Sequence, residues 1–323
     1  MTALQEMGYT VVAVDTTPPE PRQVRRLFSR IIRRLGYSPD LAGVNRQIID
    51  LISRSSFDIL WIDKGLTILP LTLTAVKKLY PECRMISYSP DDMLNTQNQS
   101  PHYLACLSLY DLHVTTKSYN VNELKELGAQ NVLFNKSGFN PLTHRPINLT
   151  AKDKYQLGSN IGFIGAFEQD RYLMMRVASQ AGFKITVRGP GWNSYIRKID
   201  NLTIKPGWIF EEDYAKAICA TKINLAFLRK ANRDLHTTRS LEIPACAAFM
   251  LAERTEEHLE LFEEGKEAEF FGSEEELTDK IKYYLAHSEE CVRIGFAGRE
   301  RCIRSGYSNH DRLKEVIHFI RHL

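Results

Sequence analysis

Residues 161–171 read IGFIGAFEQDR, and this stretch decides the fold class. The β-branched and aromatic residues of 161–164 predict a short strand, Gly165 predicts a turn, and a helix is expected to begin near Arg171. The same order of apolar run, turn and amphipathic helical stretch recurs along the chain. Such alternation is typical of parallel sheets whose strands are joined by crossover helices. The sequence therefore predicts an α/β protein.

The expected strands fall into two groups. The first group lies at 10–14, 57–62, 84–87, 112–115 and 131–134. The second lies at 161–164, 184–187, 202–205, 222–227, 249–252 and 267–271. Between the groups, residues 135–159 lose the periodicity and carry Gly138, Pro141 and Pro146, so we expect the interlobe linker there.

A chain of 323 residues exceeds what one compact core usually supports, so two lobes are expected. We place a first lobe at 1–145, a second lobe at 155–305, and a last helix within 306–323 that packs back on the first lobe. Residues 1–7 read as the end of a helix that leads into strand 10–14. The strand that normally opens such a lobe is missing, so either the lobe is trimmed or the true chain begins upstream.

Bulk properties exclude several classes of protein. The net charge of +3 is too small to predict binding of nucleic acid across the whole surface. The six cysteines form no C-x-x-C pair, which indicates a reduced, intracellular chain and no zinc site. The N-terminus has no apolar signal core, and no apolar run reaches the length of a membrane span. We therefore expect a cytoplasmic protein.

In open α/β sheets, ligands bind beyond the carboxyl ends of the strands. The turn at Gly165 leads to a helix N-terminus that suits a phosphate, and Arg171 adds a full charge. After strand 184–187 come Arg188 and Trp192, which offer a charge and a ring that stacks on a base or a sugar. The alternatives are a tight turn at Gly165 and a rigid turn with a partly buried Trp192.

The most informative stretch is 228–242, which reads LRKANRDLHTTRSLE. It leaves an apolar strand, enters an apolar helix, and gathers Asp234, His236, Arg239 and Glu242. A loop this polar at the carboxyl end of a strand is often functional, and the alternative is a solvated connection.

In the first lobe, strand 84–87 leads to Asp91 and Asp92, and strand 112–115 leads to Lys117. The two carboxylates are candidates for acid or base chemistry or for orienting sugar hydroxyls, although adjacent acids are also common in plain turns. His236 and Asp92 are the candidate general bases.

Residues 22–35 carry six arginines beside apolar residues at helical spacing. Such a helix can lie on anionic lipid, and the alternative is a helix that covers the lobe with a solvated basic face. Peripheral contact with a membrane through 22–35 is therefore one expectation. We predict that the protein sediments with anionic liposomes, and indifference to anionic lipid would contradict this.

Taken together, these residues resemble the GT-B glycosyltransferases, and most closely their CgeB-like branch of spore maturation proteins. In the second lobe the resemblance rests on IGFIG at 161–165 with Arg171, PGW at 206–208, KINL at 222–225, TRSLEIPAC at 238–246 and FMLA at 249–252. It continues through FEEG at 262–265 and FF at 270–271, and in the first lobe through FDILW at 57–61, PDD at 90–92 and YD at 110–111. It thus covers nearly the whole chain.

The resemblance implies the GT-B fold, two Rossmann-like doubly wound parallel-sheet lobes facing a central cleft. Related retaining enzymes have two glutamates separated by seven residues, and the second contacts the donor ribose. Glu242 takes this second position, and the first falls on Asp234. Arg171 matches the residue that contacts the donor diphosphate, and Arg239 is a second phosphate contact. Two residues depart from the pattern, namely Ala166 in place of an arginine and Ala247 in place of a glycine.

The implied reaction transfers a sugar from a nucleotide-diphosphate donor to an unknown acceptor, which is a polysaccharide, a lipid-linked molecule or a protein. No cofactor and no metal are expected, because fixed arginine charges and a helix N-terminus would stabilise the departing diphosphate. Closure of the lobes would exclude water. Two alternatives remain, namely a GT-B-type sugar epimerase and a non-catalytic scaffold that binds a nucleotide or a partner.

Overall fold

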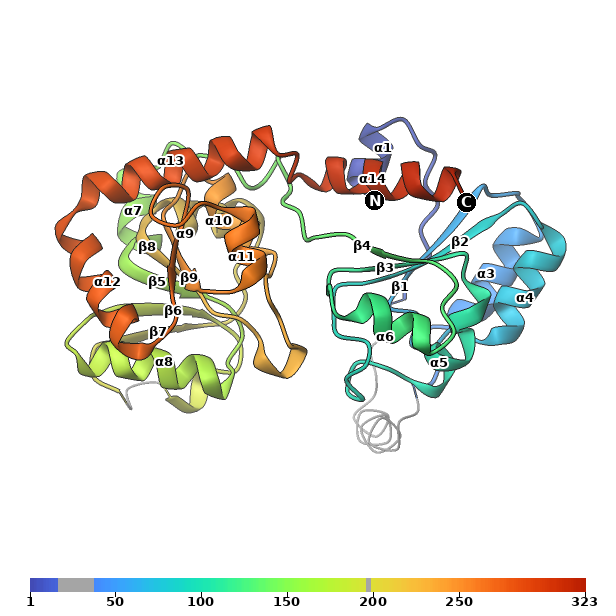
Figure 1. Ribbon diagram of the computed structural model, residues 1–323, viewed down its shortest axis with the longest axis horizontal. Helices are drawn as coiled ribbons and strands as arrows, with labels where there is room; N and C mark the ends of the chain where they lie inside the picture. The colour runs from blue at the N-terminus through green and yellow to red at the C-terminus, as the bar shows by residue number, and fades with distance from the viewer. Residues whose placement is uncertain (17–37, 196–198) are drawn as a thin grey trace. The chain divides into compact units, whose positions relative to one another are not determined.

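The computed structural model describes residues 1–16, 38–195 and 199–323 (Figure 1). The chain divides into two compact units, of which the first comprises Met1–Lys136 with Arg312–Leu323 and the second Ser137–Asp311. The second unit begins before the predicted linker ends, because residues after Ser137 already pack on it. Phe139, for example, is buried in its core. The basic stretch 22–35 lies outside the described residues.

Unit 1 contains a four-stranded parallel sheet in the order β1-β2-β3-β4. These strands are β1 (Ile59–Asp63), β2 (Arg84–Ser89), β3 (Leu112–Thr115) and β4 (Val132–Phe134). The connecting helices are α4 (Pro70–Leu79), α5 (Pro101–Cys106) and α6 (Asn120–Glu126), and α1 (Thr2–Glu6) and α3 (Val44–Ile52) precede the sheet. A short 3-10 turn, Leu107–Leu109, follows α5.

The last helix, α14 (Asn309–Arg321), covers part of the sheet of unit 1. Val316 and Ile320 are buried in one cluster with Ile86, Leu112 and Val114 of the sheet. Asn135, just after β4, donates a hydrogen bond to Glu315 Oε2 at 2.7 Å. Ser308 caps the helix by accepting a hydrogen bond from the Asp311 amide. The chain therefore completes its first unit with its last residues.

Unit 2 contains a six-stranded parallel sheet in the order β10-β9-β8-β5-β6-β7. Its strands are β5 (Ser159–Ile164), β6 (Ile185–Gly189), β7 (Leu202–Pro206), β8 (Thr221–Ala226), β9 (Met250–Glu253) and β10 (Glu269–Phe271). Its helices are α7 (Ala151–Leu157), α8 (Gln169–Gln180), α9 (Glu211–Cys219), α10 (Arg239–Ala245), α11 (Glu256–Leu261), α12 (Glu274–Ala286) and α13 (Ser288–Arg304). The strand order steps outward in both directions from β5 and β8, as in a doubly wound fold.

Burial explains why the strands of unit 2 read as apolar runs. Parallel strands are covered by helices on both faces, so residues on both sides of β5 and β8 are buried. Phe163 of β5 packs with Phe227 and Trp192 in the core on one side of the sheet. Most of the predicted strands agree with the observed ones to within about two residues.

Two expectations differ from the structure. Residues 10–14 form no strand, and Val14 instead packs against the apolar core of unit 1 around Ile62 and Val76. β-branched residues favour a strand only where a neighbouring strand can pair with them. Within the predicted linker lies a helix that periodicity did not reveal, α7. It begins with a capping box between Thr150 and Asp153.

None of the helices in the described residues is long and apolar enough to cross a membrane.

Candidate functional site

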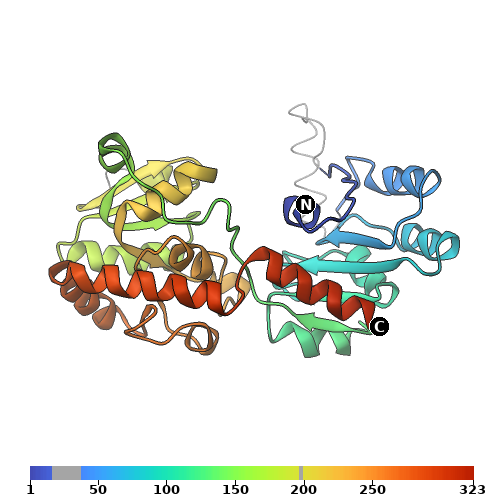
Figure 2. The same ribbon diagram turned by 90° about the horizontal axis from the view of Figure 1, so that it is seen from above.

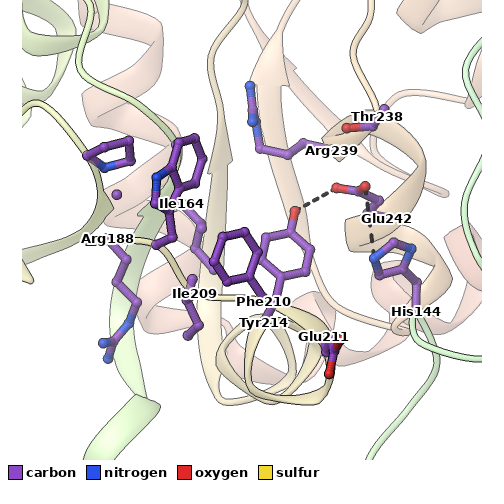
Figure 3. A pocket seen from close by; sticks show the side chains of 14 residues that line it. His144, Ile164, Arg188, Ile209, Phe210, Glu211, Tyr214, Thr238, Arg239 and Glu242 are labelled. Carbon is purple, nitrogen blue, oxygen red and sulfur yellow. Dashed lines mark hydrogen bonds and ion pairs between the residues drawn. The ribbon is translucent and has the colours of Figure 1, made fainter. Parts of the chain in front are cut away.

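A pocket of about 280 Å³ opens at the carboxyl ends of β5 and β6 in unit 2 (Figure 3). The loop between β7 and α9 forms one wall, and the first turn of α10 forms another. The pocket is lined by His144, Ile164, Gly165, Arg188, Gly189, Pro190, Trp208, Ile209, Phe210, Glu211, Tyr214, Thr238, Arg239 and Glu242. Its position agrees with the rule that open α/β sheets bind ligands at this edge.

Two glycines at the strand ends shape the floor of the pocket. Gly189 adopts φ +147°, and a Cβ atom there would lie 2.1 Å from the carbonyl oxygen of Gly165. A Cβ atom on Gly165 would lie 2.6 Å from the ring of Phe163. The ends of β5 and β6 therefore approach each other more closely than any residue with a side chain permits.

The Gly165 turn differs from the expected phosphate loop in one respect. The Gly165 amide donates to the carbonyl oxygen of Arg188 at 2.9 Å, and the Phe167 amide donates to that of Pro190 at 2.9 Å. The amides of Gly165 and Phe167 already donate to the neighbouring turn, so they are not available to bind an anion. The glycine serves close packing between the two strand ends.

Arg171 lies beneath the pocket and does not line it. Its side chain is buried, and its guanidinium group donates to the carbonyl oxygens of Ala166 and Leu228 at 3.2 and 3.4 Å. An ion pair with Glu168 spans 3.6 Å. Burial, together with the positive charge of Arg239, lowers the pKa of Arg171 to about 10. The group remains charged at neutral pH and contributes a fixed positive field.

Arg239 is the first residue of α10 and belongs to the pocket wall. Its guanidinium carbon lies 5.8 Å from the centre of the Phe163 ring, and that of Arg171 lies 5.7 Å from the same centre. The Nε atom of Arg239 is buried and lacks a hydrogen-bond partner within the described part of the chain. The side chain as a whole is only half-buried and lines the pocket, so its charge is placed to meet an anionic ligand there.

Glu242 follows one turn later on α10 and faces the same pocket (Figure 3). The Tyr214 hydroxyl donates to its Oε2 at 2.6 Å, and His144 Nε2 lies 3.9 Å from its Oε1. Burial and the nearby carboxylate raise the pKa of Tyr214 well above its usual value. Burial lowers the pKa of His144, although Glu242 opposes this shift. Tyr214 thus orients one carboxylate oxygen, and the other faces a neutral imidazole at neutral pH.

An aromatic pair forms the outer rim of the pocket. Trp208 and Phe210 are 67% and 64% exposed, and their rings stack with centroids 5.8 Å apart at 20°. Large aromatic side chains are rarely left this exposed in pairs, because their burial is strongly favourable. Such a surface is suited to stacking on a planar ring.

The structure corrects three of the sequence-based assignments. Trp192 is fully buried, and its indole N–H donates to the Gly165 carbonyl oxygen at 2.9 Å, so its ring cannot stack on a ligand. His236 is also fully buried, between Glu257 and the Ser137 amide, so it is no general base for a substrate in the pocket. Asp234 accepts hydrogen bonds from Asn232 and from the Arg229 amide and orders its own loop.

Arg188 lines the pocket, but its guanidinium group points toward the end of α7. Its guanidinium group donates to the carbonyl oxygens of Gln156 and Leu157 at 3.1 Å each, at the end of α7. Figure 3 shows this side chain extending away from Arg239 and Glu242. Arg188 therefore stabilises the end of α7, where unsatisfied carbonyl groups attract cations.

The candidate residues of unit 1 lie at the carboxyl ends of β2 and β3. Asp91 pairs with Lys64, while Asp92 is buried and accepts hydrogen bonds from the Leu94 amide and from Asn120. A buried carboxylate that holds its own loop is not placed to take a proton from an acceptor. Lys117 is buried as well. No cluster of three metal-ligating side chains occurs in residues 1–16, 38–195 and 199–323.

His144 and Phe210 line the pocket although the sequence did not predict them there. His144 lies in a stretch without periodicity, so no sequence signal distinguishes it. Phe210 has a weak signal, since it directly precedes three acidic residues that open α9. Ala247 has a positive φ of 55°, a conformation that favours glycine, which agrees with the glycine that the resemblance leads one to expect there.

Comparison with known proteins gives a family match for the second unit. Residues 169–318 match the family model described as glycosyl transferase-like. No curated protein sequence matches the chain. The matched segment includes most of unit 2 and all of α10, so both Arg239 and Glu242 lie within it.

Solved structures match both units. Sucrose-phosphate synthase from Thermosynechococcus elongatus has a TM-score of 0.62 at 13% identity, covering 87% of this chain and 78% of its own. HepE from Anabaena, in complex with UDP-glucose, has a TM-score of 0.62 at 12% identity, covering 92% and 89%. TarM from S. aureus, in complex with fondaparinux, α-GlcNAc-glycerol and UDP, has a TM-score of 0.62 at 12% identity, covering 88% and 59%. The two parallel-sheet units therefore have the GT-B fold of glycosyltransferases.

We predict that Gly189→Ala lowers the free energy of unfolding of unit 2 by about 3 kcal/mol or more, because the added methyl group meets backbone that cannot move aside. Gly182→Ala is the matched control. It also has a positive φ, of 93°, but its Cβ atom would meet open space, so its cost is about 1 kcal/mol. Equal losses for both variants in chemical denaturation would contradict the close contact.

Proposed function

We propose that this chain is a glycosyltransferase whose donor, a nucleoside diphosphate sugar, binds in the pocket of unit 2. The observation that carries the proposal is that Arg239 and Glu242, one turn apart on α10, both line the same pocket. A cation and a carboxylate on one short helix suit a ligand that combines phosphates with hydroxyl groups. A nucleotide sugar is such a ligand.

The proposed donor orientation follows the order of residues in the pocket. The exposed rings of Trp208 and Phe210 stack on the base. Such stacking accepts any base and contributes about 1–3 kcal/mol. The carboxylate of Glu242 accepts hydrogen bonds from the ribose hydroxyls. Arg239 then pairs with the diphosphate near the Gly165 turn.

Uracil is the first candidate base. UDP or UDP-glucose is present in the structures of HepE and TarM that resemble this chain. The likeness is one of fold, so the base is tested with UDP, ADP, GDP and CDP in a thermal-shift comparison.

The reaction breaks the bond between the sugar and the diphosphate. Negative charge grows on the departing diphosphate, and Arg239 offsets it directly while buried Arg171 contributes through its field. We propose that this charge, and no metal ion, stabilises the leaving group. The reaction would retain the anomeric configuration, as in relatives that share the carboxylate at the position of Glu242, and NMR of the product's anomeric proton tests this.

The likeness to the CgeB-like branch is also part of the proposal. It is supported by residues 238–246, which form α10 with its pocket-facing Arg239 and Glu242. The proposal assigns no residue to the acceptor substrate. The acidic residues at the end of β2, which were candidates for this role, are engaged within unit 1.

We predict that Arg239→Met weakens the binding of UDP by about 10- to 100-fold and leaves the binding of uridine unchanged, because a charge-assisted contact to phosphate is lost. Release of UDP from UDP-sugars would fall by about 100- to 1000-fold. Isothermal titration with both ligands and a UDP-release assay measure these effects.

The matched control is Arg176→Met, an exposed arginine on α8 outside the pocket. If Arg239→Met lowered the affinity for UDP and uridine equally, the phosphate contact would be excluded. Binding of UDP-sugars without any turnover, with or without acceptor extracts, would favour the non-catalytic scaffold instead.

We predict that Glu242→Gln weakens the binding of UDP about 10-fold but does not change the binding of 2′,3′-dideoxyuridine diphosphate, which lacks the hydroxyls that the carboxylate would hold. Glu212→Gln, an exposed acid on α9, is the control. The assigned ribose contact is refuted if the substitution affects both ligands alike.

A further inference from the structure

The outer side of α13 carries an apolar stripe that is separate from the pocket. Val292, Phe296 and Ile303 are 57%, 56% and 59% exposed. They are spaced by four and seven residues, so they lie on one side of the helix within about 40° of each other. Arg299 lies on the same side, but its guanidinium group donates a hydrogen bond to the Ala245 carbonyl oxygen. Figure 2 shows α13 lying across the front of unit 2 in that view.

The opposite side of α13 is held tightly against unit 2. A Cβ atom on Gly295 would lie 2.6 Å from the Ala247 carbonyl oxygen, and one on Gly298 would lie 2.4 Å from the Glu267 carbonyl oxygen. Cys291, Ile294 and Cys302 are buried on this side. The helix therefore cannot rotate to bury its stripe, and the exposure of the three apolar side chains is a fixed property of the fold.

A row of charged residues runs along one flank of the stripe. Its members are Glu289, Arg293, Glu300 and Arg304. Their spacings place them on one side of α13, between about 60° and 120° from Val292. Their signs alternate along the helix. Arg293 and Arg304 are 56% and 68% exposed. Arg293 contacts the Gly265 carbonyl oxygen at 3.3 Å and Glu290 at 4.0 Å, and Arg304 contacts Glu267 at 3.3 Å.

The charges of this row face opposite charges when the row of a second copy runs in the opposite direction. In an antiparallel pair of helices, the same flank of each helix faces the other. With a two-fold axis between residues 296 and 297, Glu289 opposes Arg304 of the second copy, and Arg293 opposes Glu300 of the second copy. All four contacts across the axis then join opposite charges, which favours this register.

The same register brings the apolar residues together. Phe296 lies next to the axis and meets Phe296 of the second copy. Val292 lies within about two residues, or 3 Å along the axis, of Ile303 of the second copy. The apolar and charged rows thus select one arrangement independently of each other.

We propose that α13 is the contact surface for a second copy of this chain, joined as an antiparallel, two-fold symmetric helix pair. Isologous pairing of this kind is the commonest symmetry of soluble oligomers. The row carries two positive and two negative charges, so it provides no net attraction to an anionic lipid surface. The stripe contains no residue of the donor pocket, so both copies keep the pocket accessible.

The dimer is expected to be weak, because each copy contributes three apolar side chains and small interfaces barely exceed the entropic cost of association. Sedimentation velocity of the full chain between about 5 and 500 µM should show the dimer appearing in the upper part of this range. Raising the salt concentration to about 1 M should weaken it at least severalfold, since the charged pairs are exposed. A chain that stays monomeric at the highest concentration overturns the proposal.

A charge-exchange experiment tests the register. R293E with R304E makes the row wholly acidic, and E289R with E300R makes it wholly basic. Each double variant should remain monomeric alone, and an equimolar mixture should form a heterodimer. Phe296→Ser should raise the dimer dissociation constant about 10-fold or more.

The control is the reversal of two exposed cations elsewhere on unit 2, Arg176→Glu with Lys282→Glu, which should dimerise like the unmodified chain. Circular dichroism of every variant verifies folding. Dimers that persist in both double variants, or a mixture that stays monomeric although both variants are folded, would show that the charged row does not form the contact.

Discussion

The close approach of Gly165 to Gly189 is the constraint on which the pocket depends. With no side chain at either position, the ends of β5 and β6 come close enough for the Gly165 amide to bond the carbonyl oxygen of Arg188. The indole N–H of Trp192 then occupies the Gly165 carbonyl oxygen. At the floor of the pocket, the backbone groups of Gly165 and the indole N–H of Trp192 therefore already have hydrogen-bond partners. The ligand-facing chemistry must therefore come from α10 and from the loop before α9.

The charge of the site is divided between a buried and a partly exposed arginine. Both guanidinium groups approach the Phe163 ring, and their mutual repulsion helps to lower the pKa of Arg171. Arg171 is offset by carbonyl oxygens and by Glu168, whereas the Nε of Arg239 has no such partner in the residues described. Because the side chain of Arg239 is half-buried and lines the pocket, its charge is the one of the two that a ligand there can meet directly.

Helix α10 connects the pocket to the outer surface of unit 2. Its first turn bears Arg239 and Glu242, and the turn after it, at Ala247, receives Gly295 of α13. Ala247 adopts a left-handed conformation at this contact despite its methyl group. The close contacts of Gly295 and Gly298 with unit 2 keep the apolar stripe of α13 facing outward. The proposed donor pocket and the proposed dimer surface therefore lie on elements that pack directly against each other.

Apolar periodicity and turn residues are local signals, so the α/β class, the succession of parallel strands and the importance of α10 could be predicted from the sequence. The same signals could not predict which polar residues reach the pocket. Trp192 and His236 follow strands as binding residues do, yet both are buried, and His144 enters from a stretch with no pattern. Strand-forming residues at 10–14 also remained without a partner strand. The burial of side chains and the pairing of strands arise from contacts between distant segments, so they could be read only from the folded structure.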